Sequence, residues 1–118
     1  MTVTVLIVDD HPSFRASART LLESEGFDVV GEAADGGSAV EQTRALSPDV
    51  VLLDVQLPDI DGFEVASRVT HNGGGPAVIL VSSRDARDYG QLVESSGARG
   101  FVAKDELSGP RIREMLGR

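Results

Sequence analysis

The chain contains no cysteine and no tryptophan, and only 4% of its residues are aromatic. Without cysteine, neither a disulfide framework nor a thiolate metal site can form. No apolar run approaches the roughly 20 residues that span a bilayer. The N-terminus also lacks the basic segment and the small-residue cleavage site of a signal peptide. Together these absences predict a cytoplasmic protein with no membrane segment.

Basic residues are also few, with 11 lysines and arginines against 19 acids and a formal net charge of −8. A surface of this charge repels phosphate backbones, so we expect no direct nucleic-acid binding by this domain. Hydrophobic residues make up 41% of the chain, which argues against disorder. Because 118 residues suffice for a single core, we expect one domain over residues 1–118.

Segments with strand character and segments with helix character alternate five times along the chain. Runs of consecutive aliphatic residues, such as 50–53, are typical of strands buried on both faces of a parallel sheet. Alternation of this kind predicts an α/β fold in which helices cover both faces of that sheet. The expected strands are 1–8, 27–33, 49–54, 77–81 and 99–103. The first expected helix begins at residues 11–13 and stops at Gly26, and the next three cover 39–46, 63–69 and 85–96. A short last helix is expected to be interrupted by residues 108–110.

Polar side chains stand at the carboxyl ends of four of these strands. They are Asp9 and Asp10, Asp54, Ser82 and Lys104, each directly after an apolar run. The carboxyl ends of parallel strands meet at one edge of the sheet, where the active crevice of such folds lies. We therefore expect these five side chains to lie close together in one site.

Three carboxylates at one edge repel each other, and a divalent cation removes that conflict. Mg²⁺ takes oxygen ligands, and with a nearby lysine it suits phosphoryl transfer. A carboxylate can act as the nucleophile and become an aspartyl-phosphate, and Asp54, alone on the central strand, is the candidate. The sequence has no histidine or cysteine cluster for zinc, and His11 and His71 are interpreted as loop residues without a role.

Each of these residues also has a simpler interpretation when it is taken alone. Asp9 and Asp10 resemble a helix N-cap pair, and Asp54 would begin a loop. Lys104 would be a surface lysine, and Ser82 a strand-end hydroxyl bonded to the backbone. These separate interpretations would require four coincidences at four strand ends, so we favour a single functional site formed by all of these residues.

The motifs that carry these residues resemble the receiver domain of bacterial two-component response regulators, over about residues 3 to 117. The start at residues 9–12, Asp-Asp-His-Pro, is similar to the subfamily whose receivers precede a helix-turn-helix DNA-binding domain. The resemblance implies a flavodoxin-like three-layer sandwich with a five-stranded parallel sheet of order 2-1-3-4-5. The matching motifs are 5–11, 48–58, 61–62, 81–83 and 100–104.

The resemblance also implies a function. The domain would be a signalling switch and not an enzyme, taking a phosphoryl group from a sensor histidine kinase on Asp54 with Mg²⁺. Phosphorylation would promote dimerisation, and the output would be transcription through a DNA-binding domain outside this chain, or protein contacts of a stand-alone receiver. The resemblance implies that the metal ligands are Asp9, Asp10, Asp54 and the backbone carbonyl of Gln56. It implies that the residues that bind the phosphoryl group or change conformation with it are Ser82, Ser83, Lys104 and Phe101. It also implies that Gln56 and Arg84 tune the rate of phosphate loss.

The chain departs from the family pattern at three places. Phe101 stands where tyrosine is also common, so its ring has no hydroxyl. Asp105 follows the lysine where many relatives have proline, which leaves the geometry of the peptide bond open. The interruption expected at residues 108–110 weakens the case for output through the last helix.

Two functions of other classes stay open from the sequence. A Mg²⁺-dependent phosphatase with an aspartate nucleophile commonly has a second acid two residues later, where this chain has Gln56. A flavin- or nucleotide-binding module would end its first strand in an amide-rich phosphate loop, whereas Asp9 and Asp10 would repel that phosphate.

Overall fold

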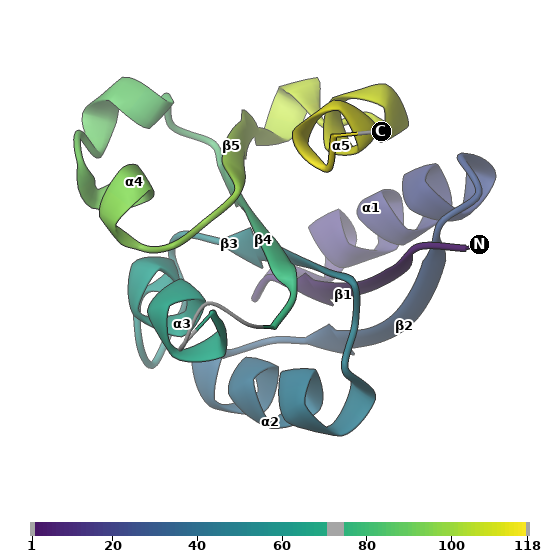
Figure 1. Cartoon of the computed structure of the whole chain (residues 1–118), viewed down its shortest axis with the longest axis horizontal. Helices are drawn as coiled ribbons and strands as arrows, with labels where there is room; N and C mark the ends of the chain where they lie inside the picture. Colours follow the sequence, from purple (N-terminus) through teal and green to yellow (C-terminus); the bar gives the residue numbers. More distant parts are fainter. Residues whose placement is uncertain (1, 71–74, 118) are drawn as a thin grey trace.

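The structure, a computed structural model, describes residues 2–70 and 75–117; His71 lies outside this part. Five parallel strands in the order β2-β1-β3-β4-β5 form one sheet between helices (Figure 1), which confirms the predicted fold. The elements are β1 (Thr4–Val8), α1 (Pro12–Ser24), β2 (Asp28–Ala33), α2 (Gly36–Leu46), β3 (Val50–Asp54), α3 (Gly62–Val69), β4 (Ala77–Ser82), the 3₁₀ helix η2 (Ala86–Asp88), α4 (Leu92–Ser95), β5 (Gly100–Ala103), the 3₁₀ helix η3 (Lys104–Glu106) and α5 (Gly109–Met115).

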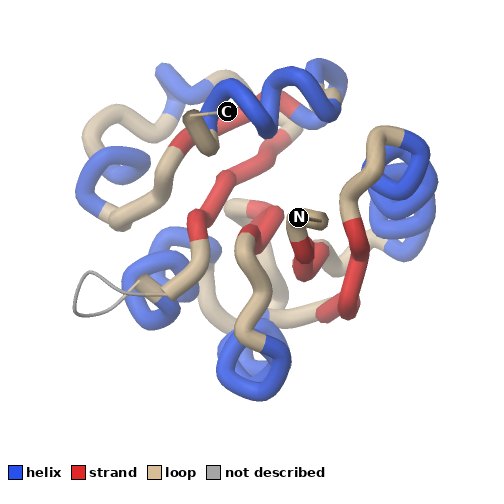
Figure 2. The backbone as a smooth tube through the Cα atoms, turned by 45° about the vertical axis from the view of Figure 1, so that its right-hand side comes forward, coloured by secondary structure: helices blue, strands red, loops and turns tan. Residues whose placement is uncertain are grey.

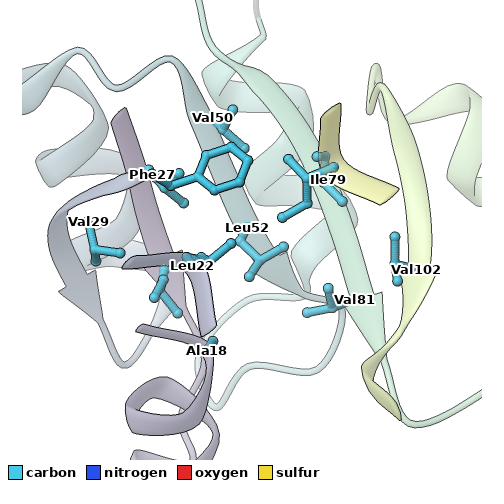
Figure 3. Packing of buried hydrophobic residues seen from close by; sticks show 12 residues of the cluster. Ala18, Leu22, Phe27, Val29, Val50, Leu52, Ile79, Val81 and Val102 are labelled. Atoms are coloured by element: carbon cyan, nitrogen blue, oxygen red, sulfur yellow. The ribbon is translucent and has the colours of Figure 1, made fainter. Parts of the chain in front are cut away.

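The sheet is buried on both faces, as the aliphatic runs predict. Side chains of successive strand residues point to opposite faces, so Val50 and Leu52 of β3 pack in one cluster with residues of α1 and α5 (Figure 3). Leu6 and Val8 pack on the other face with α2, α3 and α4. Figure 2 shows the strands in red between the two groups of helices. Each fully buried aliphatic side chain contributes about 1.5–3 kcal/mol relative to exposure.

The strand register brings the carboxyl ends of the strands together. Val8 of β1 lies beside Leu53 of β3, and Asp54 lies beside Val81 of β4. Ser82 in turn lies beside Ala103 of β5. The residues that follow these pairs therefore share one edge of the sheet.

The segment 85–96 is not the single helix that its spacing predicts. Asp85 accepts a hydrogen bond from the Arg87 N–H, at 2.9 Å, and starts only the short η2. Gly90 then takes a left-handed φ of 58°, after which α4 forms four residues. Neither η2 nor α4 contains a fully buried residue, and Leu92 is 54% exposed. The segment therefore buries too little apolar surface to stabilise one continuous helix.

Residues 108–110 begin the last helix and do not interrupt it, so that expectation was wrong. The Ser108 hydroxyl caps α5 by accepting from the Arg111 N–H at 3.2 Å. Proline suits the first turn because its missing N–H needs no partner there. The η3 turn precedes the helix, and the Lys104–Asp105 peptide bond is trans. Within the described ranges, the helices lack the length and apolar character that crossing a membrane requires.

Candidate functional site

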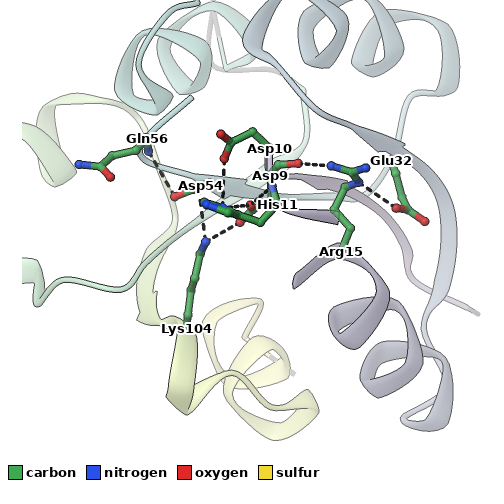
Figure 4. A network of polar contacts seen from close by, with 8 residues as sticks. All are labelled: Asp9, Asp10, His11, Arg15, Glu32, Asp54, Gln56 and Lys104. Carbon is green, nitrogen blue, oxygen red and sulfur yellow. Dashed lines mark hydrogen bonds and ion pairs between the residues drawn. The ribbon is translucent and has the colours of Figure 1, made fainter. Parts of the chain in front are cut away.

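Two buried carboxylates and a lysine meet at the carboxyl edge of the sheet (Figure 4). Asp9 is fully buried and Asp54 is 3% exposed. The Lys104 ammonium Nζ lies 2.6 Å from Asp9 Oδ2 and 3.4 Å from Asp54 Oδ2. The sequence prediction that these strand ends converge is therefore correct for these three side chains.

The closely spaced negative charges of the cluster shift the pKa values of its members. Burial, together with the nearby charge of Asp9, raises the pKa of Asp54 above its ordinary value. Burial alone would lower the pKa of Lys104, but its contacts with Asp9 and Asp54 outweigh that effect and raise the pKa. The lysine thus stays charged and offsets only part of the negative charge.

The donor atoms of the site fit a divalent cation. One ligand atom from each of Asp9, Asp10, His11 and Asp54 lies within 4.8 Å of the others. Asp9 Oδ2 is buried, and in the described part of the chain no aligned hydrogen-bond donor reaches it. Its 2.6 Å contact with Lys104 is an ion pair without hydrogen-bond geometry. Hard cations bind such carboxylate oxygens, so the acidic pocket is compatible with a divalent metal.

His11 lies at this site, although the sequence interpretation gave it no role. Its Nδ1 is 3.0 Å from Asp9 Oδ1 and 3.1 Å from Asp10 Oδ1. The side chain is largely exposed, and its backbone N–H also donates to Asp9 Oδ1, at 2.8 Å. Its place directly after two acids was the only signal of this position in the sequence.

Two side chains of α1 support the pocket, and sequence reasoning missed both. Arg15 donates to the backbone carbonyl of Asp9 at 2.6 Å and pairs with Glu32 of β2 at 3.1 Å. The ring of Phe14 lies under the Lys104 ammonium, with 4.5 Å from Nζ to the ring centroid. A cation held over a ring face is attracted by it, so α1 helps to hold both Asp9 and Lys104.

Ser82 has partners other than Asp54 and Lys104 in this structure. Its hydroxyl accepts from the Arg84 N–H at 3.0 Å and lies 2.9 Å from the Tyr89 hydroxyl. Ser83 and the Arg84 side chain are exposed, and Phe101 is half-buried. Tyr89 was expected only as an apolar residue of a helix, and its bond to Ser82 has no signal in the sequence.

These observations can be compared with known proteins. A family profile described as "Response regulator receiver domain" matches residues 5–116. The chain belongs to this family. The receiver-domain resemblance read from the motifs is thereby confirmed.

Several relatives of this receiver domain are transcription regulators. It is 35% identical over 104 residues to the DNA-binding transcriptional activator EvgA of Escherichia coli K12, covering 88% of this chain and 51% of EvgA. It is 38% identical over 102 residues to the virulence factors putative positive transcription regulator BvgA of Bordetella pertussis Tohama I, covering 86% and 49%. The chain therefore spans about half the length of these curated relatives.

A solved structure supports the same fold. The signal receiver domain of the putative response regulator NarL from Mycobacterium tuberculosis superposes with a TM-score of 0.86 at 38% identity. The match covers 99% of this chain and 98% of that one. The receiver domain thus has a counterpart that matches it along almost its whole length.

The loop after β3 is clamped in the receiver domain by a carboxylate. Gln56 donates its backbone N–H to Asp54 Oδ1 at 3.2 Å, while its side chain is exposed. Three residues later, Asp59 accepts from the N–H groups of Gly36 and Gly37 at 2.8 and 2.9 Å. Asp59 therefore ties the loop that carries Gln56 to the start of α2.

This clamp predicts a dependence of stability on pH. The two backbone donors lower the pKa of Asp59 from 3.8 to about 2. Because the folded-state pKa is depressed, the stabilisation is complete above 3.8 and disappears as the pH falls through about 2. Asp59→Ala should lower the melting temperature at neutral pH, and the deficit should shrink over this acid range. Thermal melts of both proteins across the range measure it.

Asp88→Ala, which removes an exposed acid of η2, serves as the matched control and should show a small difference. A deficit for Asp59→Ala that stays constant as the pH falls would contradict the role of the ionised carboxylate.

Proposed function

We propose that this receiver domain, over residues 1–118, is a switch that accepts a phosphoryl group on Asp54. The observation that carries the proposal is the position of Asp54, a buried carboxylate beside Lys104 and the Asp9–Asp10 pair at the carboxyl edge of the sheet. Burying an ionised carboxylate costs free energy unless partners compensate for it, so its position at this edge points to a functional role. The domain affiliation supports the same function.

The chemical step follows from the residues around Asp54. An ionised oxygen of Asp54 attacks the phosphorus of a phosphohistidine, and the bond between phosphorus and nitrogen breaks. The electron pair leaves with the imidazole, which then takes up a proton. The Gln56 N–H holds Asp54 Oδ1 at 3.2 Å, and Lys104 lies 3.4 Å from Oδ2, where it offsets the charge of the incoming group.

Mg²⁺ is the proposed cofactor, held by Asp9, Asp10, Asp54 and the backbone carbonyl of Gln56. When bound, it would neutralise the negative charge on the phosphoryl oxygens. Asp9 Oδ2, a buried oxygen that accepts no aligned hydrogen bond, and the ligand atoms within 4.8 Å of one another support this assignment.

After transfer, Ser82, Ser83 and Lys104 would contact the phosphoryl oxygens, and Phe101 would turn inward. Such contacts shift the conformational equilibrium only by as much as they differ between the two states. Gln56 and Arg84 each come two residues after a strand-end residue of the site, to which their backbone N–H groups donate, and both residues are exposed. These positions support their proposed role in tuning phosphate loss.

The proposed partner is a sensor histidine kinase, in the cytoplasm, and phosphorylation would promote dimerisation. The output would be transcription through a DNA-binding domain outside this chain. The relation to EvgA, named a DNA-binding transcriptional activator and twice as long as the match, supports that output. No turnover of outside substrates is proposed, because Gln56 stands where aspartate-nucleophile phosphatases commonly have an acid.

Incubation with Mg²⁺ and acetyl phosphate, followed by intact-mass measurement, tests the proposal. We expect the addition of one phosphoryl group per chain, and none when EDTA removes the metal. Absence of uptake with Mg²⁺ would overturn the proposal. Sustained hydrolysis of a phosphomonoester over many turnovers would instead favour a phosphatase.

A further inference from the structure

Ser82 and Asp54 lie on neighbouring strands but belong to opposite faces of the sheet. Asp54 follows the alternation of Leu52, which packs with α1 and α5. Ser82 follows that of Leu80, which packs with α2, α3 and α4. Since alternate strand residues share a face, the Ser82 side chain starts on the face away from Lys104 and Asp9.

On that face Ser82 meets Tyr89, the residue directly after η2. The two hydroxyl oxygens are 2.9 Å apart. The Tyr89 ring packs edge-on against Phe63 of α3, with centroids 5.4 Å apart, and lies 5.9 Å from the ring of Phe101 on β5. Tyr89 therefore touches both the hydroxyl and the aromatic ring that the proposed switch uses.

We infer that Tyr89 is a latch, a positioning residue that holds the unphosphorylated conformation. Its hydroxyl keeps Ser82 turned away from Asp54, and its ring occupies the space beside Phe101. The inference rests on the proposed function, since it concerns the contact that Ser82 would make with a phosphoryl group on Asp54.

The hydrogen-bonding capacity of Ser82 supports the latch. A serine hydroxyl has one proton and two lone pairs, and the Arg84 N–H already occupies one lone pair, at 3.0 Å. Ser82 is 3% exposed, so its hydroxyl has little access to water that could replace Tyr89 as a partner. If the Ser82 hydroxyl turned towards Asp54, its bond with Tyr89 would break. The free energy of that bond therefore opposes the change to the phosphorylated conformation.

The position of Tyr89 would allow its release to change the conformation of a surface segment. Phe101 carries no hydroxyl, and Tyr89 is the one tyrosine of the chain. The flanking η2 and α4 contain no fully buried residue, and this segment is held on the buried cluster by the partly buried Tyr89 and Val93. In Figure 1 the segment forms the corner of the molecule between β4 and β5. Release of Tyr89 would loosen this corner when Asp54 is phosphorylated.

Tyr89→Phe tests the inference because it removes the hydroxyl and keeps the ring. Beryllium trifluoride with Mg²⁺, as a phosphoryl mimic, is titrated into each protein by calorimetry. The variant should bind roughly fivefold more tightly, the effect of losing one hydrogen bond made only in the unphosphorylated state. In a Ser82→Ala background the same substitution should have no effect, because the latch bond is already absent.

Thr43→Val, which removes a buried hydroxyl bond on α2, is the matched control and should leave the affinity unchanged. Weaker binding by Tyr89→Phe would overturn the latch, since Tyr89 would then support the phosphorylated state; unchanged binding would overturn it as well. Failure of the unmodified chain to bind the mimic, by contrast, would count against the proposed function. The fluorescence of the single tyrosine gives a second readout, and it should change when the mimic binds to the unmodified chain.

Discussion

Asp54→Asn will take up no phosphoryl group from acetyl phosphate and Mg²⁺ under conditions that fully label the unmodified chain. The substitution keeps the shape of the side chain but replaces the nucleophilic carboxylate with an amide. Lys104 retains its ion pair with Asp9 at 2.6 Å, so the pocket does not lose its cation. Intact-mass measurement, with peptide mapping of the labelled chain, reads out the loss.

The same substitution should stabilise the metal-free protein at neutral pH. Burial and the charge of Asp9 raise the pKa of Asp54 above 3.8, so the ionised carboxylate is less favourable in the folded state than in the unfolded state. The penalty is absent well below 3.8, grows as the pH rises above 3.8, and is complete once the pH has passed the raised folded-state pKa. The neutral amide of the variant carries no such penalty, and thermal melts in EDTA should show a higher melting temperature than for the unmodified chain.

Asp88→Asn, a change at an exposed acid, controls for the loss of one negative charge. It should be labelled as fully as the unmodified chain and melt at nearly the same temperature. Phosphate found on the Asp54→Asn chain would show that the acceptor lies elsewhere.

The sheet could be predicted from the sequence because its signal is local. The runs at 50–53 and 77–81 have no polar residue, a pattern typical of a strand covered on both faces. The site followed from the same pattern, since Asp54 and Lys104 each end or follow a strand of that sheet. Parallel topology then places such residues at one edge without further information.

The parts that were missed depend on contacts between distant segments or on a local signal that was misread. Helical spacing in 85–96 does not reveal that Tyr89 packs on Phe63 and Phe101, two other elements of the fold. The contact of Phe14 with Lys104 likewise joins residues far apart in sequence. By contrast, Ser108 before a first-turn proline is a helix-start signal, so the beginning of α5 was predictable from the rules of helix capping.

Gly62→Ala should destabilise the protein by about 3 kcal/mol, a large part of the stability of a domain of this size. A Cβ added at Gly62 would lie 2.3 Å from the carbonyl oxygen of Asp54 and 2.8 Å from the Cα of Val55. Both are backbone atoms that cannot rotate away, and the Gly62 N–H also donates to the Val55 carbonyl, at 2.7 Å. Urea unfolding measures the loss.

The same displacement should slow phosphate uptake from acetyl phosphate, because the backbone that moves carries both Asp54 and Gln56. Gly37→Ala is the matched control, since a Cβ there would meet its nearest neighbour, Asp59 Oδ2, at an ordinary 3.5 Å. It should change stability by less than about 0.5 kcal/mol and leave uptake unchanged. If Gly62→Ala were as stable and as readily labelled as Gly37→Ala, the close approach of α3 to β3 would not position the acceptor. If both properties fall together, the packing that ends β3 and starts α3 also sets the place of the Asp54 carboxylate.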